Sequence, residues 1–199
     1  MKKEIILIGA GGHAESIIDI IENKNEYSIA GLIGFSHEVG MTRYGYQVIG
    51  TDKDLVSLRK DYQHACLAVG HMGIGETRKN LFIYMKELAF YFPPILANNA
   101  YASSRSVIGE GSVIMCNAFL NAGARIGKIS IINTGSIVEH GTSIGENTHI
   151  STGVIVNGNV QIGDNCFIGS GSVVREGISI ASNSFIKMSQ RLISDVKDI

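Results

Sequence analysis

The chain has 199 residues, of which 45% are hydrophobic, and its 17 Lys and Arg residues against 18 Asp and Glu residues give a formal net charge of -1. This length and apolar content suffice for one or two buried cores, and the near-neutral charge provides no basic surface for the phosphates of a nucleic acid. No apolar stretch approaches the length that spans a membrane, and the first residues are unlike a secretory signal. We therefore expect a cytoplasmic protein that binds neither nucleic acid nor membrane.

The cysteines Cys66, Cys116 and Cys166 are scattered along the chain and form no CxxC pair. Such spacing fits a reducing compartment and provides no cluster of metal ligands. We expect these cysteines to be structural, and we expect no metal site.

A strand, a glycine turn and a helix are predicted at the start of the chain. Residues 4–9 (EIILIG) form the strand, and Gly9, Gly11, Gly12 and His13 follow in the segment GAGGH. The helix that begins there repeats apolar residues on one face, namely Ile17, Ile18, Ile20 and Ile21. Backbone N–H groups and the helix N-terminus can face an anion in such a turn, so its residues are candidates for binding substrate phosphate.

The second strand is predicted at residues 28–35 and ends at Phe35. A dinucleotide-binding fold would have a third glycine in the preceding turn and an acidic residue at the end of this strand, and this sequence has neither. NAD is therefore not expected, and Phe35 is a candidate contact for another substrate.

A third strand is predicted at residues 64–69, followed by Gly70 and His71. A helix is predicted at residues 77–88, and it carries Arg78. Gly70, His71 and Arg78 are further candidates for substrate binding, although a basic residue on a helix more often lies on a solvated face.

A last strand is predicted at residues 89–92, and Pro93 and Pro94 follow it. Because diproline stiffens and extends the chain, we place the domain boundary here. The prediction is a Rossmann-like domain over residues 1–94 and a second domain over residues 95–199.

The second half of the sequence repeats with a period of six. A small or β-branched residue comes four residues after most of the repeated positions, as at Ser112 and Ala124, and glycine comes one residue after several, as at Gly109 and Gly127. The repeated positions, fifteen in succession, are all Ile, Leu or Val: residues 108, 114, 120, 126, 132, 138, 144, 150, 156, 162, 168, 174, 180, 186 and 192.

This hexapeptide repeat predicts a β-helix. Three hexads make one triangular coil, in which the aliphatic residue points inward and glycine allows backbone conformations that other residues resist. The predicted fold class is α/β plus all-β, with a small Rossmann-like domain followed by a left-handed parallel β-helix.

His140 is the third residue of its hexad, and Ala122 and Gly158 occupy the same column one coil away. Adjacent coils are ~4.8 Å apart, so these small residues are expected to leave space on both sides of the imidazole, where a substrate could lie. Glu139 precedes the histidine, but successive strand residues point to opposite faces, so its carboxylate is not expected to reach the ring.

The segment GAGGHAESIIDII, the hexapeptide repeats and the segment INTGSIVEH at residues 132–140 together resemble the NeuD/PglD family of sugar acetyltransferases. The resemblance covers nearly the whole chain. It implies that the first domain binds the nucleotide part of a nucleotide-linked amino sugar, that the β-helix forms a homotrimer, and that acetyl-CoA lies between neighbouring β-helices.

The same resemblance assigns roles to individual residues. It implies the general base at His140, a polar residue of the same site at Asn133, and the histidine of the glycine turn at His13. The acetyl-CoA contacts are assigned to His149, near the thioester carbonyl, and to Ser151, Gly158 and Gly169. His149 has Ile131 and Phe167 as column neighbours, so ordinary packing is an equal alternative for it.

The sequence departs from the family pattern at two places. Many N-acetyltransferases of the family have an acidic residue directly after the catalytic histidine, whereas this chain has Gly141, like members linked to sialic acid pathways. The segment SQRLIS at residues 189–194 replaces a VGxPAK-like tail. We expect the contacts that this tail makes with CoA to be missing or replaced.

The function predicted first is acetyl-CoA-dependent N-acetylation of a UDP- or dTDP-linked amino sugar in bacterial surface-glycan biosynthesis. The alternatives are O-acetylation of a sialic or nonulosonic acid, and a non-catalytic scaffold within a sugar-biosynthesis complex.

Overall fold

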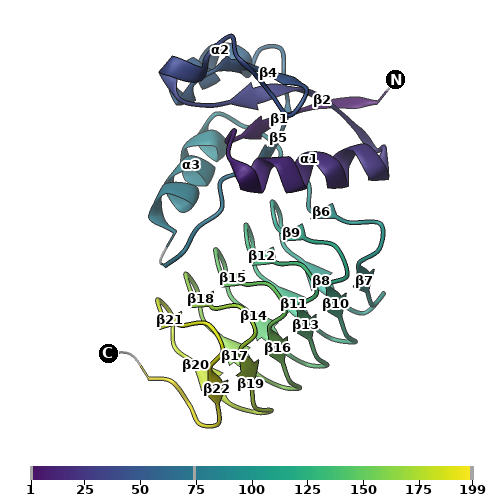
Figure 1. Cartoon of the computed structure of the whole chain (residues 1–199), viewed down its shortest axis with the longest axis vertical. Coiled ribbons are helices and arrows are strands. Elements are labelled where there is room, and N and C mark those ends of the chain that lie inside the picture. The colour runs from purple at the N-terminus through teal and green to yellow at the C-terminus, as the bar shows by residue number, and fades with distance from the viewer. Residues whose placement is uncertain (1, 74, 198–199) are drawn as a thin grey trace.

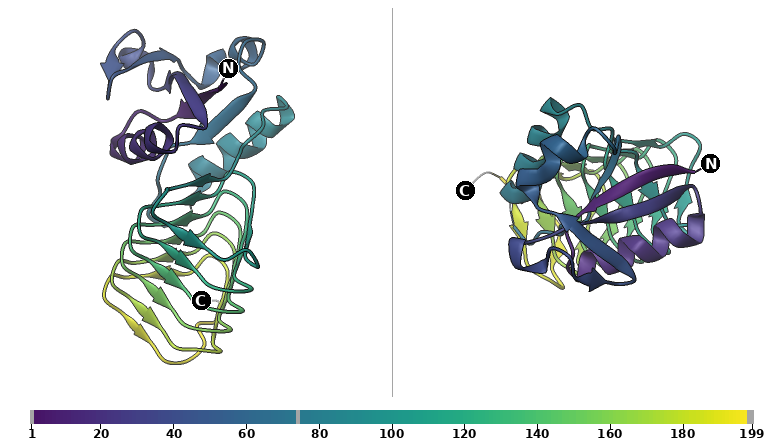
Figure 2. Two further views of the ribbon diagram at one scale, coloured as in Figure 1. Left: turned by 90° about the vertical axis from the view of Figure 1, so that its right-hand side faces the viewer. Right: turned by 90° about the horizontal axis from the view of Figure 1, so that it is seen from above.

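The computed structural model describes residues 2–73 and 75–197. An α/β domain lies along one long side of a triangular prism, and the coils of the prism run beneath it toward the C-terminus (Figures 1 and 2). The predicted fold class, a Rossmann-like part followed by a parallel β-helix, is confirmed. In the part of the chain that the structure describes, no helix is long and apolar enough to cross a membrane.

The α/β domain is built on a five-stranded sheet with the order β3-β4-β2-β1-β5. All neighbouring strands pair in parallel except β3 and β4. Residues 5–8 of β1 are fully buried, as expected for a central parallel strand covered on both faces. The strands are β1 (Lys3–Ile8), β2 (Tyr27–Ile33), β3 (Thr42–Arg43), β4 (Tyr46–Gly50) and β5 (His64–Leu67).

Helix α1 (Gly12–Lys24) buries the apolar face that its sequence period predicts, including Ile17 and Ile21. It ends at Asn25, whose φ of 61° is the left-handed conformation common after a helix. The other helical segments are η1 (Ser36–Glu38), η2 (Asp52–Asp54), α2 (Leu55–Leu58) and α3 (Glu76–Glu87).

Two predictions for this domain need correction. Residues 89–92 form no strand, because Ala89 has a φ of 62° and only Tyr91 pairs with the sheet, through an isolated bridge to His64. The strands β3 and β4 are also not predicted from the sequence. These strands lie at one edge of the sheet, where most of their side chains are exposed or half-buried, so they lack a strong apolar pattern.

The prism has three parallel sheets, and we name each by its outer side. The covered sheet packs against the α/β domain: β6 (Ile95–Leu96), β9 (Val113–Ile114), β12 (Ile131–Ile132), β15 (His149–Ile150), β18 (Phe167–Ile168) and β21 (Phe185–Ile186). The apolar sheet is β7 (Tyr101–Ala102), β10 (Phe119–Leu120), β13 (Ile137–Val138), β16 (Ile155–Val156), β19 (Val173–Val174) and β22 (Arg191–Leu192). The polar sheet is β8 (Val107–Ile108), β11 (Arg125–Ile126), β14 (Ser143–Ile144), β17 (Gln161–Ile162) and β20 (Ser179–Ile180).

The repeated aliphatic residues fill the prism. From Ile114 to Ile186 they are buried in one core, and Ile108 and Leu192 pack at its two ends. Small residues fit between coils, where Ser130 donates a hydrogen bond of 2.8 Å to the carbonyl of Gly145. The six-residue period thus determines both the interior and the hydrogen bonds between coils.

A left-handed residue recurs at the corners of the prism with the same period of six. Positive φ angles occur every six residues from Gly111 to Ser189, mostly at glycine and asparagine, which tolerate this conformation. The conformational role that the sequence analysis gives to Gly109 and Gly127 is wrong, because neither has a positive φ. Each is required for space instead, since a Cβ atom would lie 2.5–2.6 Å from the backbone of the next coil.

Helix α1 joins the two parts of the molecule. Its buried residues Ile17 and Ile21 share a core with Ile95, Val113 and Met115 of the covered sheet and the turn after it. The corner between the apolar and polar sheets therefore lies on the far side of the prism from the α/β domain.

Candidate active site

The glycine turn leaves backbone groups accessible at the N-terminus of α1. Gly9 has a φ of 122°, and a Cβ atom there would lie 3.0 Å from the backbone of Ala68, so this position requires glycine. At Gly11 and Gly12 a Cβ atom would meet nothing within 4 Å. Their small size therefore keeps the N–H groups at the positive end of the helix dipole open to an anion.

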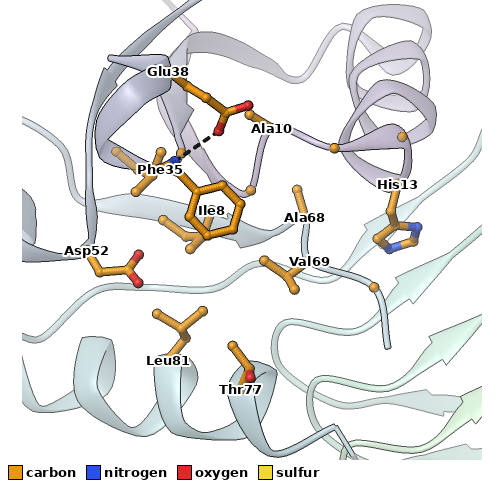
Figure 3. Close-up of a pocket in the computed structure, with 16 residues that line it drawn as sticks. Ile8, Ala10, His13, Phe35, Glu38, Asp52, Ala68, Val69, Thr77 and Leu81 are labelled. Atoms are coloured by element: carbon orange, nitrogen blue, oxygen red, sulfur yellow. Dashed lines mark hydrogen bonds between the residues drawn. The ribbon is translucent and has the colours of Figure 1, made fainter. Parts of the chain in front are cut away.

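A pocket of about 400 Å³ lies beside this turn, at the carboxyl ends of β1, β2 and β5 (Figure 3). This is where ligands bind in open α/β sheets. The predicted residues Gly9, Gly11, Gly12, Phe35 and Gly70 line it, together with His13. The other lining residues are Ile8, Ala10, Ile33, Gly34, Glu38, Asp52, Ala68, Val69, Thr77 and Leu81.

His13 reaches the pocket as a neutral side chain. Burial, with Arg78 nearby, lowers the pKa of His13 to about 3. Its Nε2 atom is buried and has no hydrogen-bond partner within residues 2–73 and 75–197. The ring packs beside Gly70, where a Cβ atom would approach its Cγ atom to 3.4 Å. His13 therefore contributes a neutral ring to the pocket wall, with one buried nitrogen that no described group bonds.

Arg78 does not lie on a solvated helix face, whereas its contact with substrate stays a prediction. Its side chain is fully buried, and the residue does not line the pocket beside the glycine turn. Its guanidinium donates hydrogen bonds of 2.7 and 2.8 Å to the carbonyls of Leu67 and Val69 and one of 3.1 Å to that of Ile129 in the prism. Arg78 therefore connects β5, α3 and the β-helix, which the helical period alone cannot indicate.

His71 and His149 meet where the α/β domain contacts the covered sheet, with ring centroids 5.3 Å apart. Nδ1 of His149 lies 2.8 Å from the carbonyl oxygen of His71, so this nitrogen carries the proton and donates it. Burial lowers the pKa of His149 to about 4, so the ring is neutral and its Nε2 accepts from Nδ2 of Asn133 at 3.0 Å. In this arrangement the ring has no free N–H for a thioester carbonyl.

His71 does not line the pocket beside the glycine turn. Its Nδ1 lies 2.9 Å from the carbonyl of Gly73, so its ring closes the loop that precedes α3. Its backbone carbonyl then fixes the proton position of His149. His71 is thus a positioning residue in this structure. It also lines a second hollow, together with Gly70 and Arg78, and its contact with substrate stays a prediction.

His140 lies on the corner between the apolar and polar sheets, two residues after β13, and it is exposed. Space on both sides of the imidazole is predicted, but only part of that prediction holds. The ring itself lies over Gly158, where a Cβ atom would be 2.6 Å from Cε1 and 2.7 Å from Nε2. Gly158 therefore leaves the space that the imidazole occupies, and its contact with acetyl-CoA stays a prediction.

The residues beside His140 do not bond its ring. The Glu139 carboxylate accepts hydrogen bonds from the backbone N–H of His140 and from the side chain of Asn121, at 3.2 and 2.6 Å. Gly141 has a φ of 66°, and a Cβ atom there would collide with Oδ1 of Asn159. An acidic side chain at position 141 would therefore meet both backbone strain and a steric clash.

The predicted catalytic residues do not form one site within a single chain. Asn133 follows β12, at the corner between the covered and apolar sheets, whereas His140 lies one corner further. Ser151 and Gly169 share the corner of Asn133 on later coils. Oγ of Ser151 is 2.8 Å from that of Ser170, and their contact with acetyl-CoA stays a prediction.

Several residues that line the pocket are not among the predicted site residues, above all Asp52, Thr77 and Leu81. Asp52 follows the edge strand β4, which is itself not predicted. The available signal was the segment YQVIGTD, in which a short alternating run is followed by an acidic residue. Among residues 2–73 and 75–197, no group of three His, Cys, Asp or Glu side chains is arranged to hold a metal ion.

Comparison with protein families identifies both parts of the chain. Residues 4–84 match the PglD N-terminal domain, and residues 141–176 and 159–188 match the bacterial transferase hexapeptide repeats. A search of curated proteins found no match to the sequence.

Solved structures resemble the chain over nearly its whole length. PerB from Caulobacter crescentus, in complex with CoA and GDP-perosamine, is 26% identical, with a TM-score of 0.91 over 98% of this chain and 91% of its own. The acetyltransferase domain of PglB from Neisseria gonorrhoeae, in complex with acetyl coenzyme A, is 27% identical, with a TM-score of 0.90 over 100% and 94%. WeeI from Acinetobacter baumannii, at 22% identity and a TM-score of 0.85 over 98% and 93%, shares the fold.

A prism of hexapeptide repeats with an exposed histidine, attached to a PglD-type domain with a pocket at its sheet edge, defines a hexapeptide-repeat acetyltransferase. The chain combines a PglD N-terminal domain with hexapeptide repeats, and its structure matches sugar acetyltransferases of the NeuD/PglD type, which confirms the resemblance found in the sequence.

Proposed function

We propose that this protein transfers the acetyl group of acetyl-CoA to the amino group of a nucleotide-linked amino sugar. Residues 1–94 bind the nucleotide, and residues 95–199 carry the acetyl transfer. The reaction belongs to the synthesis of bacterial surface glycans, and it takes place in the cytoplasm. The main support is the pairing of a pocket beside the glycine turn with an exposed imidazole held over Gly158.

His140 is the general base of the proposed reaction. The nitrogen lone pair of the amino sugar attacks the thioester carbonyl carbon, and the imidazole takes the proton that the nitrogen loses. The C–N bond forms, the C–S bond breaks, and the thiolate of CoA receives a proton as it leaves. Histidine suits this proton transfer because it accepts and releases protons near neutral pH.

The nucleotide pocket and His140 lie on opposite sides of the prism in one chain. The α/β domain packs on the covered sheet, and His140 occupies the corner opposite that sheet. A substrate held in the pocket must therefore meet the His140 of another chain. We propose that the protein is a homotrimer whose active sites form between neighbouring chains.

The apolar sheet provides a surface for this assembly. From β7 to β19 its outward side chains are Tyr101, Phe119, Ile137, Ile155 and Val173, one above the other on successive strands, and Arg191 of β22 ends the row. Tyr101 and Val173 are exposed by 54% and 38% of their surface. A continuous apolar stripe of this kind marks a protein interface, and closed cyclic symmetry uses it equally in every copy.

A thiol-release assay with acetyl-CoA and nucleotide-linked amino sugars tests the proposal. The expected product is heavier than the acceptor by one acetyl group and resists hydroxylamine, because an amide is formed. His140→Ala should lower kcat by about 100-fold or more without changing the melting temperature. An unchanged rate in this variant would remove His140 from the mechanism.

O-acetylation is the second candidate, because Gly141 leaves no room for the acidic residue of the N-acetyltransferases. The same assay separates the two reactions. An ester product would be cleaved by hydroxylamine. The absence of thiol release with every acceptor would instead favour a non-catalytic scaffold.

A further inference from the structure

The carboxylate of Asp52 lies in the nucleotide pocket, and no group in the described part of the chain bonds it. Asp52 follows β4 and lines the pocket, and its carboxylate makes no hydrogen bond or ion pair within residues 2–73 and 75–197. The other acid of the pocket, Glu38, differs. Its carboxylate accepts from the backbone N–H of Phe35 at 2.9 Å and pairs with Arg43 at 3.2 Å.

The surroundings of Asp52 are largely apolar. Figure 3 shows its carboxylate at one end of the pocket and His13 at the other, with Phe35 and Leu81 on opposite walls between them. Asp52 remains exposed to solvent, and desolvation by its surroundings raises the pKa of its carboxyl group. A carboxylate accepts hydrogen bonds from a ligand, and its charge strengthens them.

The position of the glycine turn indicates how a nucleotide-linked sugar would lie along the pocket. If the diphosphate lies on the N-terminus of α1, near His13, the sugar must leave the pocket toward a catalytic histidine outside this domain. The nucleoside then extends the other way, from β1 past β2 to the end of β4. These strand ends are two strand spacings apart, or ~10 Å, which one nucleoside can span.

Phe35 provides a stacking surface along this path. Its side chain is 73% exposed, and its ring stacks on His37 with an interplanar angle of 6° and a centroid distance of 5.9 Å. One face of the ring is therefore occupied, and the other is available to a planar base. A base between Phe35 and Leu81 would present its outer edge to Asp52.

A carboxylate only accepts hydrogen bonds, so the base must present donors to it. Guanine has two adjacent donors on its Watson–Crick edge, the N1–H and N2–H groups. Uracil and thymine have one N–H between two carbonyl oxygens, which a carboxylate repels, and adenine and cytosine have an acceptor beside the amino group. Only guanine can therefore form a bidentate pair with Asp52.

We propose that Asp52 binds the N1–H and N2–H groups of guanine, and that the sugar substrate is carried on guanosine diphosphate. This inference rests on the proposed function, and it replaces the uridine or thymidine nucleotide expected from the sequence with a guanosine nucleotide.

Calorimetric titration with nucleoside diphosphates tests this base preference on the intact protein. GDP should bind tightest, and IDP, which lacks the N2 amino group, should bind about tenfold more weakly because one charge-assisted hydrogen bond is lost. UDP and dTDP should be weaker still. XDP, whose C2 oxygen would face the carboxylate, should be the weakest of the purine nucleotides.

Asp52→Asn should lower the affinity for GDP by about tenfold or more. It should raise the affinity for XDP, because the new amide group can donate a hydrogen bond to the C2 oxygen. Asp61→Asn, which changes an exposed aspartate outside the pocket, is the matched control and should keep the GDP preference. The exchange of preference cannot result from unfolding, since a damaged pocket would lose both nucleotides.

Equal affinity for GDP and UDP would overturn the proposal. The proposal would also be overturned if affinity were lost only on changing the nucleotides to their 2′-deoxy forms, because the carboxylate would then bind the ribose. Acetyl transfer to amino sugars on other nucleotides, with GDP binding unchanged in Asp52→Asn, would reject the guanine contact and leave the acetyltransferase function intact. If no nucleoside diphosphate binds, the nucleotide-binding function itself fails.

Discussion

The imidazole of His140 is positioned by packing on the next coil. No side chain among the described residues bonds the ring, and it lies directly over the Cα atom of Gly158. Glycine is needed there because any Cβ atom would occupy the space of the ring. Since adjacent coils are held at a fixed spacing by their hydrogen bonds, the prism determines the height of the base above the next coil.

Gly158→Ala should therefore displace the imidazole without unfolding the prism. We expect kcat to fall about 100-fold, because a shift of about 1 Å in a catalytic group costs that much, while the KM for the nucleotide sugar changes little. Glu176→Ala, in the same column one coil further, is the control and should keep the wild-type kcat. A fully active Gly158→Ala enzyme would show that Gly158 does not position the base.

At the scale of elements, the buried side chain of Arg78 connects α3 to the sheet and to the prism. Arg78 bonds the carbonyls of Leu67, Val69 and Ile129. Burial lowers its pKa to about 10, so it stays charged at neutral pH. Ile129 has a φ of 50°, which strains a β-branched residue, and its contacts with Arg78 and with the core beside Phe92 stabilise that conformation.

Arg78→Lys should lower the free energy of unfolding by about 3 kcal/mol, because a lysine cannot reach all three carbonyls and leaves buried acceptors unpaired. Urea denaturation followed by circular dichroism measures this change. Lys79→Gln, at the exposed neighbouring position, should have no comparable effect. If Arg78→Lys were as stable as the wild type, the three hydrogen bonds would not contribute to the junction between the domains.

The junction of the two domains should make stability depend on pH. His149 has a pKa of about 4 in the folded protein and an ordinary value of 6.5 when unfolded. Between these values the unfolded chain binds a proton that the folded chain does not, so the free energy of unfolding falls as the pH falls, by about 1.4 kcal/mol per pH unit. Above pH 6.5 this contribution is constant.

His149→Gln should remove this dependence. The difference in unfolding free energy between wild type and variant, measured by urea denaturation from pH 7.5 to 4.5, should be largest at high pH and shrink below pH 6.5. His37→Gln, at an exposed histidine, should follow the wild-type curve. A difference that does not vary with pH would mean that His149 is not held neutral by its burial.

At the scale of the whole molecule, the prism separates the nucleotide pocket from the proposed catalytic base of the same chain. The nucleotide pocket lies on the side of the covered sheet, and the base lies at the opposite corner. Asn133 and His149 are bonded to each other near the α/β domain, away from His140 of the same chain. The proposed trimer brings the pocket of one chain to the base of the next.

Mixing two inactive variants tests this shared site. Gly12→Asp should repel the diphosphate at the N-terminus of α1, and His140→Ala removes the base. After subunit exchange, mixed assemblies should regain up to about a quarter of the wild-type activity, because some sites combine an intact pocket with an intact base from another chain. Ile137→Lys in the apolar stripe, added to both variants, should give monomers by light scattering and prevent this recovery.

No recovery in assemblies that light scattering shows to be mixed would contradict a site between chains. It would require the pocket and His140 of one chain to meet, which the present arrangement does not allow. A monomeric wild-type protein with full activity would contradict the trimer as well.

The sequence by itself determined the β-helix and the glycine turn. A core position recurs every six residues from 108 to 192, and such a period is local, so it can be read without knowing the contacts. The strand, turn and helix around Gly9 are also contiguous in the chain. The resemblance carried by the segment around His140 added the reaction class.

Only the tertiary structure decided what Arg78 and His149 contact and that Asp52 lines the pocket. The partners of Arg78 and His149 lie far away in the sequence, as Ile129 does from Arg78, and each contact depends on how the α/β domain packs on the covered sheet. Side-chain burial, proton positions and the identity of a pocket wall arise from this packing. They have no local period from which a sequence could reveal them.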